Sequence, residues 1–193
     1  MLRVATVVAE TEAEGPGRRF AVWLQGCSIR CAGCCNPEMF DARRGDETSP
    51  AELAARIPAG VEGITLLGGE PFEQPAGAAE FARLAKARGL TVMVFSGYTL
   101  AELRARPDAG ELHALVDLLV DGRYDQALPE PAPPAGRRWI GSANQTMHYL
   151  TTAYCDTDPR MRGANTIEIR LSRGNLLING WPSADALVRR RHG

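Results

Sequence analysis

Three cysteines set close together are the residues whose types and spacing most directly indicate chemistry in this chain. Cys27, Cys31 and Cys34 form a C-x3-C-x2-C pattern directly after a short apolar segment at residues 20–26. Three thiolates on one loop can converge on one metal centre. A structural zinc site takes four protein ligands, usually as two separated pairs, whereas a four-iron cluster held by three cysteines leaves one iron open to a small molecule. The pattern therefore favours an open iron–sulfur cluster over zinc.

The remaining two cysteines and one histidine are left without a role. Cys35 directly follows Cys34, and adjacent residues rarely reach the same small cluster without strain, so we expect a bystander thiol. No second cysteine group accompanies Cys155, which favours an unligated side chain. His148 either faces the active site or is a hydrogen-bonded structural histidine, and we expect the second. Clustering of four of the five cysteines in one stretch argues for a metal in a reducing compartment rather than a disulfide scaffold.

A second candidate site is the GGEP segment, residues 68–71, which ends the apolar run that starts at residue 63. Ligands of parallel α/β folds bind beyond the carboxyl ends of the strands. Glycines without a Cβ let backbone groups approach a ligand closely, so Gly69→Asp is expected to block that approach. Because this segment and the cysteine loop, residues 27–35, follow neighbouring strands, we expect both to line the same end of one sheet.

Apolar runs alternate with helical patterns along much of the chain. Ser49 and Thr99 each open a capping box, and a helix is expected at about residues 75–88, closed by Gly89. The expected strands are residues 20–26, 63–69, 90–95 and 115–120. This alternation predicts βαβ units and a parallel sheet.

The organisation changes beyond residue 120. Residues 127–136 are rich in proline and predict a loop or a rigid spacer on the surface. An antiparallel hairpin is expected at about residues 165–180. We see no repeat and no second domain, so residues 1–193 are expected to form a single domain.

Charge and hydropathy exclude several classes of function. The 193 residues carry a formal net charge of -1, which gives no electrostatic basis for binding nucleic acid or an anionic membrane. No apolar run approaches the ~20 residues of a membrane-spanning helix, and the N-terminus lacks the apolar core of a signal peptide. We therefore expect a soluble, cytoplasmic protein with neither nucleic-acid nor membrane partners.

Several short stretches, taken together in chain order, resemble the radical S-adenosylmethionine (SAM) enzymes. Within them the chain is most similar to the small activating proteins of anaerobic ribonucleotide reductase, a branch of the glycyl-radical enzyme activases. Besides the cysteine triad, the matching stretches are EGPGR at 14–18, QGC at 25–27, NPE at 36–38, GGEP at 68–71, FSGYT at 95–99, VDG at 120–122 and GSANQ at 141–145.

The resemblance implies a fold and a set of site residues. The fold would be an α/β partial barrel of the radical SAM kind, extended by the C-terminal hairpin. Cys27, Cys31 and Cys34 would ligate a [4Fe–4S] cluster, whose open iron would be chelated by the amino and carboxylate groups of SAM. The expected SAM-binding residues are Gly68, Gly69 and Glu70, which match the segment that recognises the methionine amino group, together with Ser96 and Asp121 at the ends of the next two strands.

The implied reaction is reductive cleavage of SAM to a 5′-deoxyadenosyl radical, which abstracts a hydrogen atom from the substrate. The leading hypothesis is formation of a glycyl radical on a larger partner enzyme such as anaerobic ribonucleotide reductase, with electrons from a flavodoxin or ferredoxin. The alternative is radical SAM modification of a peptide or small molecule in a biosynthetic pathway. A third, non-enzymatic hypothesis is an iron–sulfur or zinc protein that serves as a scaffold or electron carrier. Residues past Tyr149 exceed what the shortest members of the branch need, which leaves the substrate open.

Overall fold

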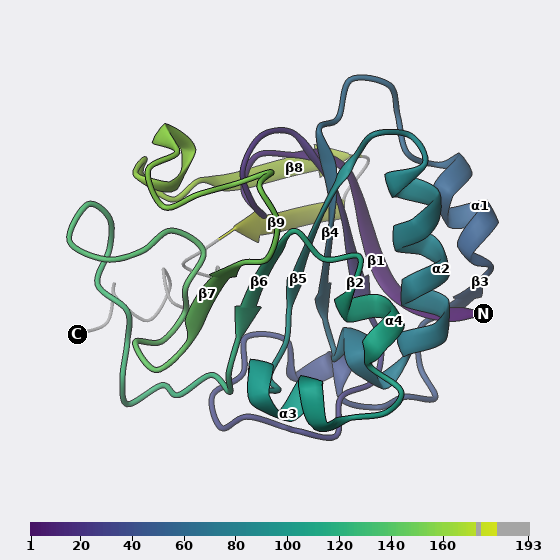
Figure 1. Cartoon of the computed structure of the whole chain (residues 1–193), viewed down its shortest axis with the longest axis horizontal. Coiled ribbons are helices and arrows are strands. Elements are labelled where there is room, and N and C mark those ends of the chain that lie inside the picture. The colour runs from purple at the N-terminus through teal and green to yellow at the C-terminus, as the bar shows by residue number, and fades with distance from the viewer. Residues whose placement is uncertain (173–174, 181–193) are drawn as a thin grey trace.

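The computed structural model describes residues 1–172 and 175–180. A seven-stranded mixed sheet lies at its centre, with the strand order β3-β1-β2-β4-β5-β6-β7 (Figure 1). Four neighbouring strands, β2, β4, β5 and β6, pair in parallel, and the others pair antiparallel. The bounds are β1 Leu2–Thr11, β2 Arg19–Leu24, β3 Asp46–Thr48, β4 Gly63–Gly68, β5 Thr91–Phe95, β6 Leu118–Asp121 and β7 Thr146–Tyr149. The expected parallel pairing is thus confirmed for these four strands, within a sheet that is mixed.

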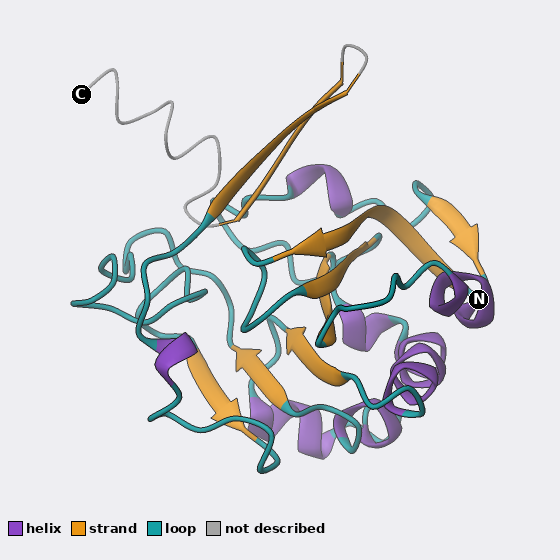
Figure 2. Ribbon diagram, turned by 90° about the horizontal axis from the view of Figure 1, so that it is seen from above, coloured by secondary structure: helices purple, strands orange, loops and turns teal. Residues whose placement is uncertain are grey.

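The helices gather along one side of this sheet (Figure 2). They are α1 Pro50–Ala55, α2 Pro75–Lys86, α3 Leu100–Ala105 and α4 Gly110–His113, with single 3-10 turns at η1 Pro37–Met39, η2 Pro71–Glu73 and η3 Pro159–Met161. Both expected capping boxes are present: the Ser49 and Thr99 hydroxyls each accept the backbone N–H three residues on, and their own backbone N–H groups donate to the side chain of that glutamate. The starts of α1 and α3 are therefore determined by local sequence.

The side chains of the parallel strands alternate between two buried faces. Phe20, Val22 and Leu24 of β2 pack in the larger core with the helices, whereas Ala21 and Trp23 point to the opposite face. The same alternation on β5 places Val92 and Val94 toward the helices and Met93 away from them. Burial of both faces explains why these strands read as continuous apolar runs.

The start of the fourth parallel strand differs from the sequence expectation. We expected a strand over residues 115–120, and β6 instead begins at Leu118. The turn that follows α4 continues through the intervening residues, since Val116 N–H donates to the His113 carbonyl at 3.3 Å. Local helical hydrogen bonds therefore override the apolar pattern there. Strands β1, β3 and β7 were not predicted.

A separate two-stranded sheet, β8 Ile167–Ser172 and β9 Asn175–Gly180, forms the expected hairpin. It projects beyond the main sheet (Figure 2), and its base is attached to the end of β1, where the Glu12 N–H donates to Glu168 Oε1 at 2.8 Å. Residues 127–136 form the expected surface loop, with one β-bridge between Pro129 and Ser142. Among the described residues no helix is long and apolar enough to cross a membrane.

Candidate active site

A cavity of about 580 Å³ lies where the parallel strands end. Its wall includes residues at the ends of four strands that are neighbours in the sheet. These are the cysteine loop after β2, the glycine segment of residues 68–70 at the end of β4, Ser96 and Gly97 after β5, and Gly122 after β6. A volume of this size suits a small organic ligand. The expectation that the two motifs share one end of the sheet is confirmed.

The three cysteines of the triad all line this cavity, and each is half-buried with a free thiol. Backbone bonds from Gly26 N–H to Met39 O, 2.8 Å, and from Cys27 N–H to Phe40 O, 3.3 Å, tie the start of the loop to η1. The Gln25 amide closes the base of the loop by donating to two further carbonyls, those of Glu38 and Asp41. The loop is therefore held at both ends by main-chain contacts.

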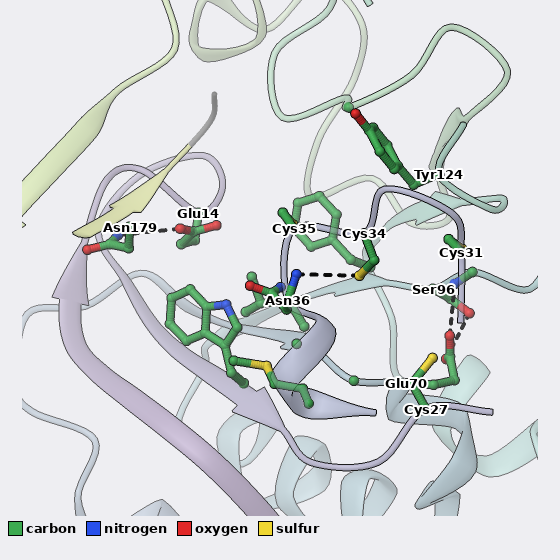
Figure 3. Close-up of a pocket in the computed structure, with 18 of the residues that line it drawn as sticks. Glu14, Cys27, Cys31, Cys34, Cys35, Asn36, Glu70, Ser96, Tyr124 and Asn179 are labelled. Carbon is green, nitrogen blue, oxygen red and sulfur yellow. Dashed lines mark hydrogen bonds between the residues drawn. The ribbon is translucent and has the colours of Figure 1, made fainter. Parts of the chain in front are cut away.

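The thiols differ in their acid–base environment. Burial raises the pKa of Cys27 and of Cys31. A hydrogen bond from the neighbouring Cys35 lowers the pKa of Cys34 to about 7, and the Asn36 N–H also donates to Cys34 Sγ at 3.4 Å (Figure 3). The same contact with Cys34 raises the pKa of Cys35. Cys34 is thus the member of the triad nearest to the thiolate form that binds metal.

The donor chemistry of the cavity fits an iron–sulfur cluster. Three soft thiol donors on one wall are the ligand set such clusters use. Within residues 1–172 and 175–180, no three His, Cys, Asp or Glu side chains converge closely enough to hold one metal ion. Ligands of a cluster bind different irons and so need not converge on one point. A structural zinc site takes four protein ligands, whereas the triad supplies three thiols.

Glycine is needed at positions 68 and 69 for a different physical reason from the one that the sequence suggested. A Cβ at Gly69 would lie 2.2 Å from the Gly26 carbonyl oxygen, and one at Gly68 would lie 2.7 Å from Trp23 Cα. Gly69 N–H donates to Leu24 O, and the Glu70 N–H donates to Gly26 O, both at 2.8 Å. These glycines thus let the chain after β4 lie close beside the end of β2 and the residues that follow it. Any Gly69 substitution disturbs this close packing, so Gly69→Asp does not test ligand approach alone.

Glu70 is buried beside the cavity and links two strand ends. Its carboxylate accepts the Phe72 N–H at 3.0 Å, the Ser96 hydroxyl at 2.9 Å and the Gly97 N–H at 2.8 Å (Figure 3). Burial raises the pKa of Glu70 to about 7, although these bonds oppose the rise. Glu70 and Ser96 therefore lie together at the site as expected. Their side chains bind each other, so the Glu70 side chain serves to fix β4 against β5.

Asp121 lies at the end of β6 but is not among the described residues that line the cavity. Its Oδ2 accepts the Leu100 N–H at the start of α3 and lies 3.0 Å from His148 Nε2 on β7. The carboxylate is buried in this contact. The structure does not bring Asp121 to the cavity with Ser96. His148 Nε2 lies near the Asp121 carboxylate but forms no hydrogen bond with the described residues, so the expected hydrogen-bonded role of His148 stays a prediction.

The other two cysteines also differ in position. Cys35 is exposed and contributes to the cavity wall beside Cys34. Cys155 is exposed elsewhere, with its Sγ 3.1 Å from Thr157 Oγ1, and is not among the described lining residues.

The opposite wall of the cavity was not expected from the sequence. It comes from Glu14 and from residues 177–180 of the hairpin (Figure 3). Glu14 Oε1 accepts the Gly180 N–H at 2.7 Å and lies 3.4 Å from Asn179 Nδ2. Burial raises the pKa of Glu14 to about 7. Glu14 belongs to the EGPGR stretch, but its contact joins residues 166 positions apart, which no local pattern reveals.

Comparison with known proteins gives consistent matches. The family described as "4Fe-4S single cluster domain" matches residues 13–148, so the hairpin lies beyond the matched segment. The anaerobic ribonucleoside-triphosphate reductase-activating protein of Vibrio cholerae is 32% identical over 149 residues, 71% of this chain and 91% of that protein. The Escherichia coli K12 protein of the same name is 32% identical, with 70% and 91% covered. The pyruvate formate-lyase-activating enzyme of Listeria monocytogenes is 35% identical over 101 residues, 49% of this chain and 41% of that enzyme.

Proposed function

Because the chain belongs to the 4Fe-4S single cluster domain family and is a radical SAM activating enzyme, we propose that it forms a glycyl radical on an anaerobic ribonucleotide reductase. Its cofactors are a [4Fe–4S] cluster and SAM. The observation that carries the proposal is the shared cavity, where the cysteine triad, the glycine segment and Ser96 meet. The relatives of similar length are named for activation of that reductase.

We assign the cluster to Cys27, Cys31 and Cys34, because these thiols share one wall of the cavity. When bound, the cluster and SAM supply one-electron cleavage of the sulfonium and removal of a hydrogen atom from the substrate. The protein contributes position and exclusion of water. The parallel pairing of β2 and β4 places the main chain at Gly69 next to the start of the cysteine loop, while the Glu70 carboxylate holds Ser96 and Gly97 in place.

The finer features of the proposal rest on the same arrangement. We infer that the mixed sheet corresponds to a partial radical SAM barrel, with the parallel strands β2, β4, β5 and β6 as its core. A flavodoxin or ferredoxin would supply the electron. Free cysteines favour a reducing compartment such as the cytoplasm.

The alternative target is a peptide or a small molecule. One observation supports this alternative. Residues 177–180 of the hairpin line the cavity but lie outside the segment that the family match covers. A chain that modified such a substrate would still cleave SAM, but adding the reductase would yield no protein radical.

The decisive experiment uses anaerobically reconstituted protein with dithionite, SAM and the glycyl-radical reductase encoded in the same genome. Chromatography measures 5′-deoxyadenosine, and electron paramagnetic resonance (EPR) detects the glycyl radical. Cys31→Ser is expected to lose cluster iron and both signals, whereas Cys35→Ser, a matched thiol removal on the same loop, is expected to keep them. Cleavage of SAM without a protein radical would refute the reductase as target. No cleavage by protein that holds four irons would oppose the proposed reaction itself.

A further inference from the structure

Glu73 lies behind the cysteine loop, outside the cavity that the triad lines. Its carboxylate accepts the Ser28 backbone N–H at 3.0 and 3.1 Å and the Ser28 hydroxyl at 2.5 Å. The Tyr98 hydroxyl, from the segment that follows β5, donates to the same carboxylate at 3.3 Å. Ser28 is the residue directly after Cys27. A single carboxylate thus holds the first cysteine of the loop against the ends of two strands.

The contact is specific in its chemistry. A carboxylate has two acceptor oxygens, and here they meet donors from a backbone amide and two hydroxyls, an arrangement stronger than neutral hydrogen bonds. Two features indicate that this carboxylate is held in place rather than free on the surface. Glu73 is half-buried at the end of η2, and its partner Tyr98 is itself held by the Arg106 guanidinium, 4.7 Å above the ring.

The charge of Glu73 lies close to Cys27. Its carboxylate is hydrogen-bonded to Ser28, the residue next to Cys27, so the negative charge stands beside the first cysteine of the loop. The same negative charge opposes the addition of an electron nearby, because a reduced cluster carries one more negative charge. Charge and hydrogen bonding around a cluster are among the factors that set its reduction potential. A carboxylate behind Cys27 would therefore make the reduced state a stronger electron donor.

We propose that Glu73 is a positioning residue that holds Cys27 for cluster binding through Ser28 and lowers the reduction potential of the cluster by its charge. The proposal rests on the assignment of Cys27 as a cluster ligand. Residues that orient metal ligands typically change metal affinity by 10–100-fold when they are replaced.

Three variants separate the hydrogen bonds from the charge. Glu73→Gln removes the charge and presents an amide N–H₂ where one acceptor stood. Glu73→Asp keeps the charge but is shorter by one methylene, so it loses reach to Ser28. Ser28→Ala removes only the hydroxyl donor. Glu80→Gln is the matched control, because Glu80 is exposed on α2 and its replacement removes the same charge away from the loop.

Two readouts apply to the anaerobically reconstituted protein: the rate at which an iron chelator removes the cluster, and the midpoint potential from an EPR-monitored titration. Glu73→Gln is expected to lose iron about tenfold faster than Glu80→Gln and to have a higher potential. Glu73→Asp is expected to lose iron faster with a potential nearer to that of the wild type, and Ser28→Ala is expected to show a smaller increase in iron loss.

The proposal would be overturned if Glu73→Gln and Glu80→Gln had the same rate of iron loss or the same midpoint potential. A lower thermal unfolding midpoint of the apoprotein, with iron loss and potential unchanged, would reduce Glu73 to a folding role and also overturn it. If the Glu73 variants fail to fold, Ser28→Ala still tests the proposal. An unchanged rate of iron loss in Ser28→Ala would contradict the role of the Ser28–Glu73 contact in holding Cys27. A wild type that assembles no cluster would instead refute the proposed function, so the two failures are distinguishable.

Discussion

Replacing Glu14 with glutamine is expected to stabilise the apoprotein, and more so as the pH rises. Burial raises the pKa of Glu14 from 4.5 to about 7, so the folded state binds this proton more tightly than the unfolded state. Between these two values the unfolded chain is ionised and the folded one is not, and the free energy of unfolding therefore falls as pH increases. Glutamine at this position is neutral at every pH, and its Oε1 can still accept the Gly180 N–H.

The size of the effect follows from the same shift. At pH 8 the ionised carboxylate costs the folded state roughly 3 kcal/mol relative to a neutral group, since each pKa unit corresponds to about 1.4 kcal/mol. At pH 5 the difference between Glu14→Gln and wild type shrinks to about 1 kcal/mol, because the folded wild type is already protonated.

The assay is urea unfolding of the metal-free, reduced protein at pH 5 and pH 8. Titration of groups that do not interact with Glu14 affects both proteins alike and cancels in the difference. Glu12→Gln, at an exposed site two residues earlier, is the control and is expected to show a small difference that does not grow with pH. An equal gain or loss for Glu14→Gln at both pH values would refute the reasoning, because the carboxylate would then carry no burial cost.

The remaining predictions concern packing, pairing and capping, and all are checked by urea unfolding. Gly69→Ala is expected to destabilise the apoprotein by about 3 kcal/mol or more, since its Cβ meets the Gly26 carbonyl. Lys86→Met is expected to cost about 3 kcal/mol, because Lys86 is the partner, at 2.6 Å, of the buried Asp117; a neutral result would mean that Asp117 does not depend on the lysine. Thr99→Ala removes a helix cap and is expected to cost about 1 kcal/mol.

Sequence patterns were sufficient to place the two motifs of the site. The cysteine loop and the GGEP segment each follow an apolar run, and the carboxyl ends of parallel strands meet at one edge. The capping boxes at Ser49 and Thr99 were equally readable, because their bonds span three residues. Local sequence therefore sufficed to place the cysteine loop and the GGEP segment at one end of the sheet.

Contacts between distant segments were not readable in this way. Asp121 ends a strand much as Ser96 follows one, but α3 begins beside Asp121, and the Leu100 N–H donates a hydrogen bond to its carboxylate. The glycines at 68 and 69 suggested approach to a ligand, whereas their tightest neighbours are backbone and side-chain atoms of β2 and the residues after it. In both cases the sequence identifies the residue and the strand end, but only the packing of neighbouring elements decides the contact.

The two walls of the cavity differ in origin and in chemistry. The wall formed by the cysteine loop and the ends of β4 and β5 lies within residues 13–148, which match the family. Residues 177–180 of the opposite wall lie beyond that segment and join it through Glu14, a buried carboxylate. The residues that we propose for the cofactors lie on the first wall. A change at residues 177–180 would therefore alter the second wall and leave the cysteine loop and the strand ends unchanged.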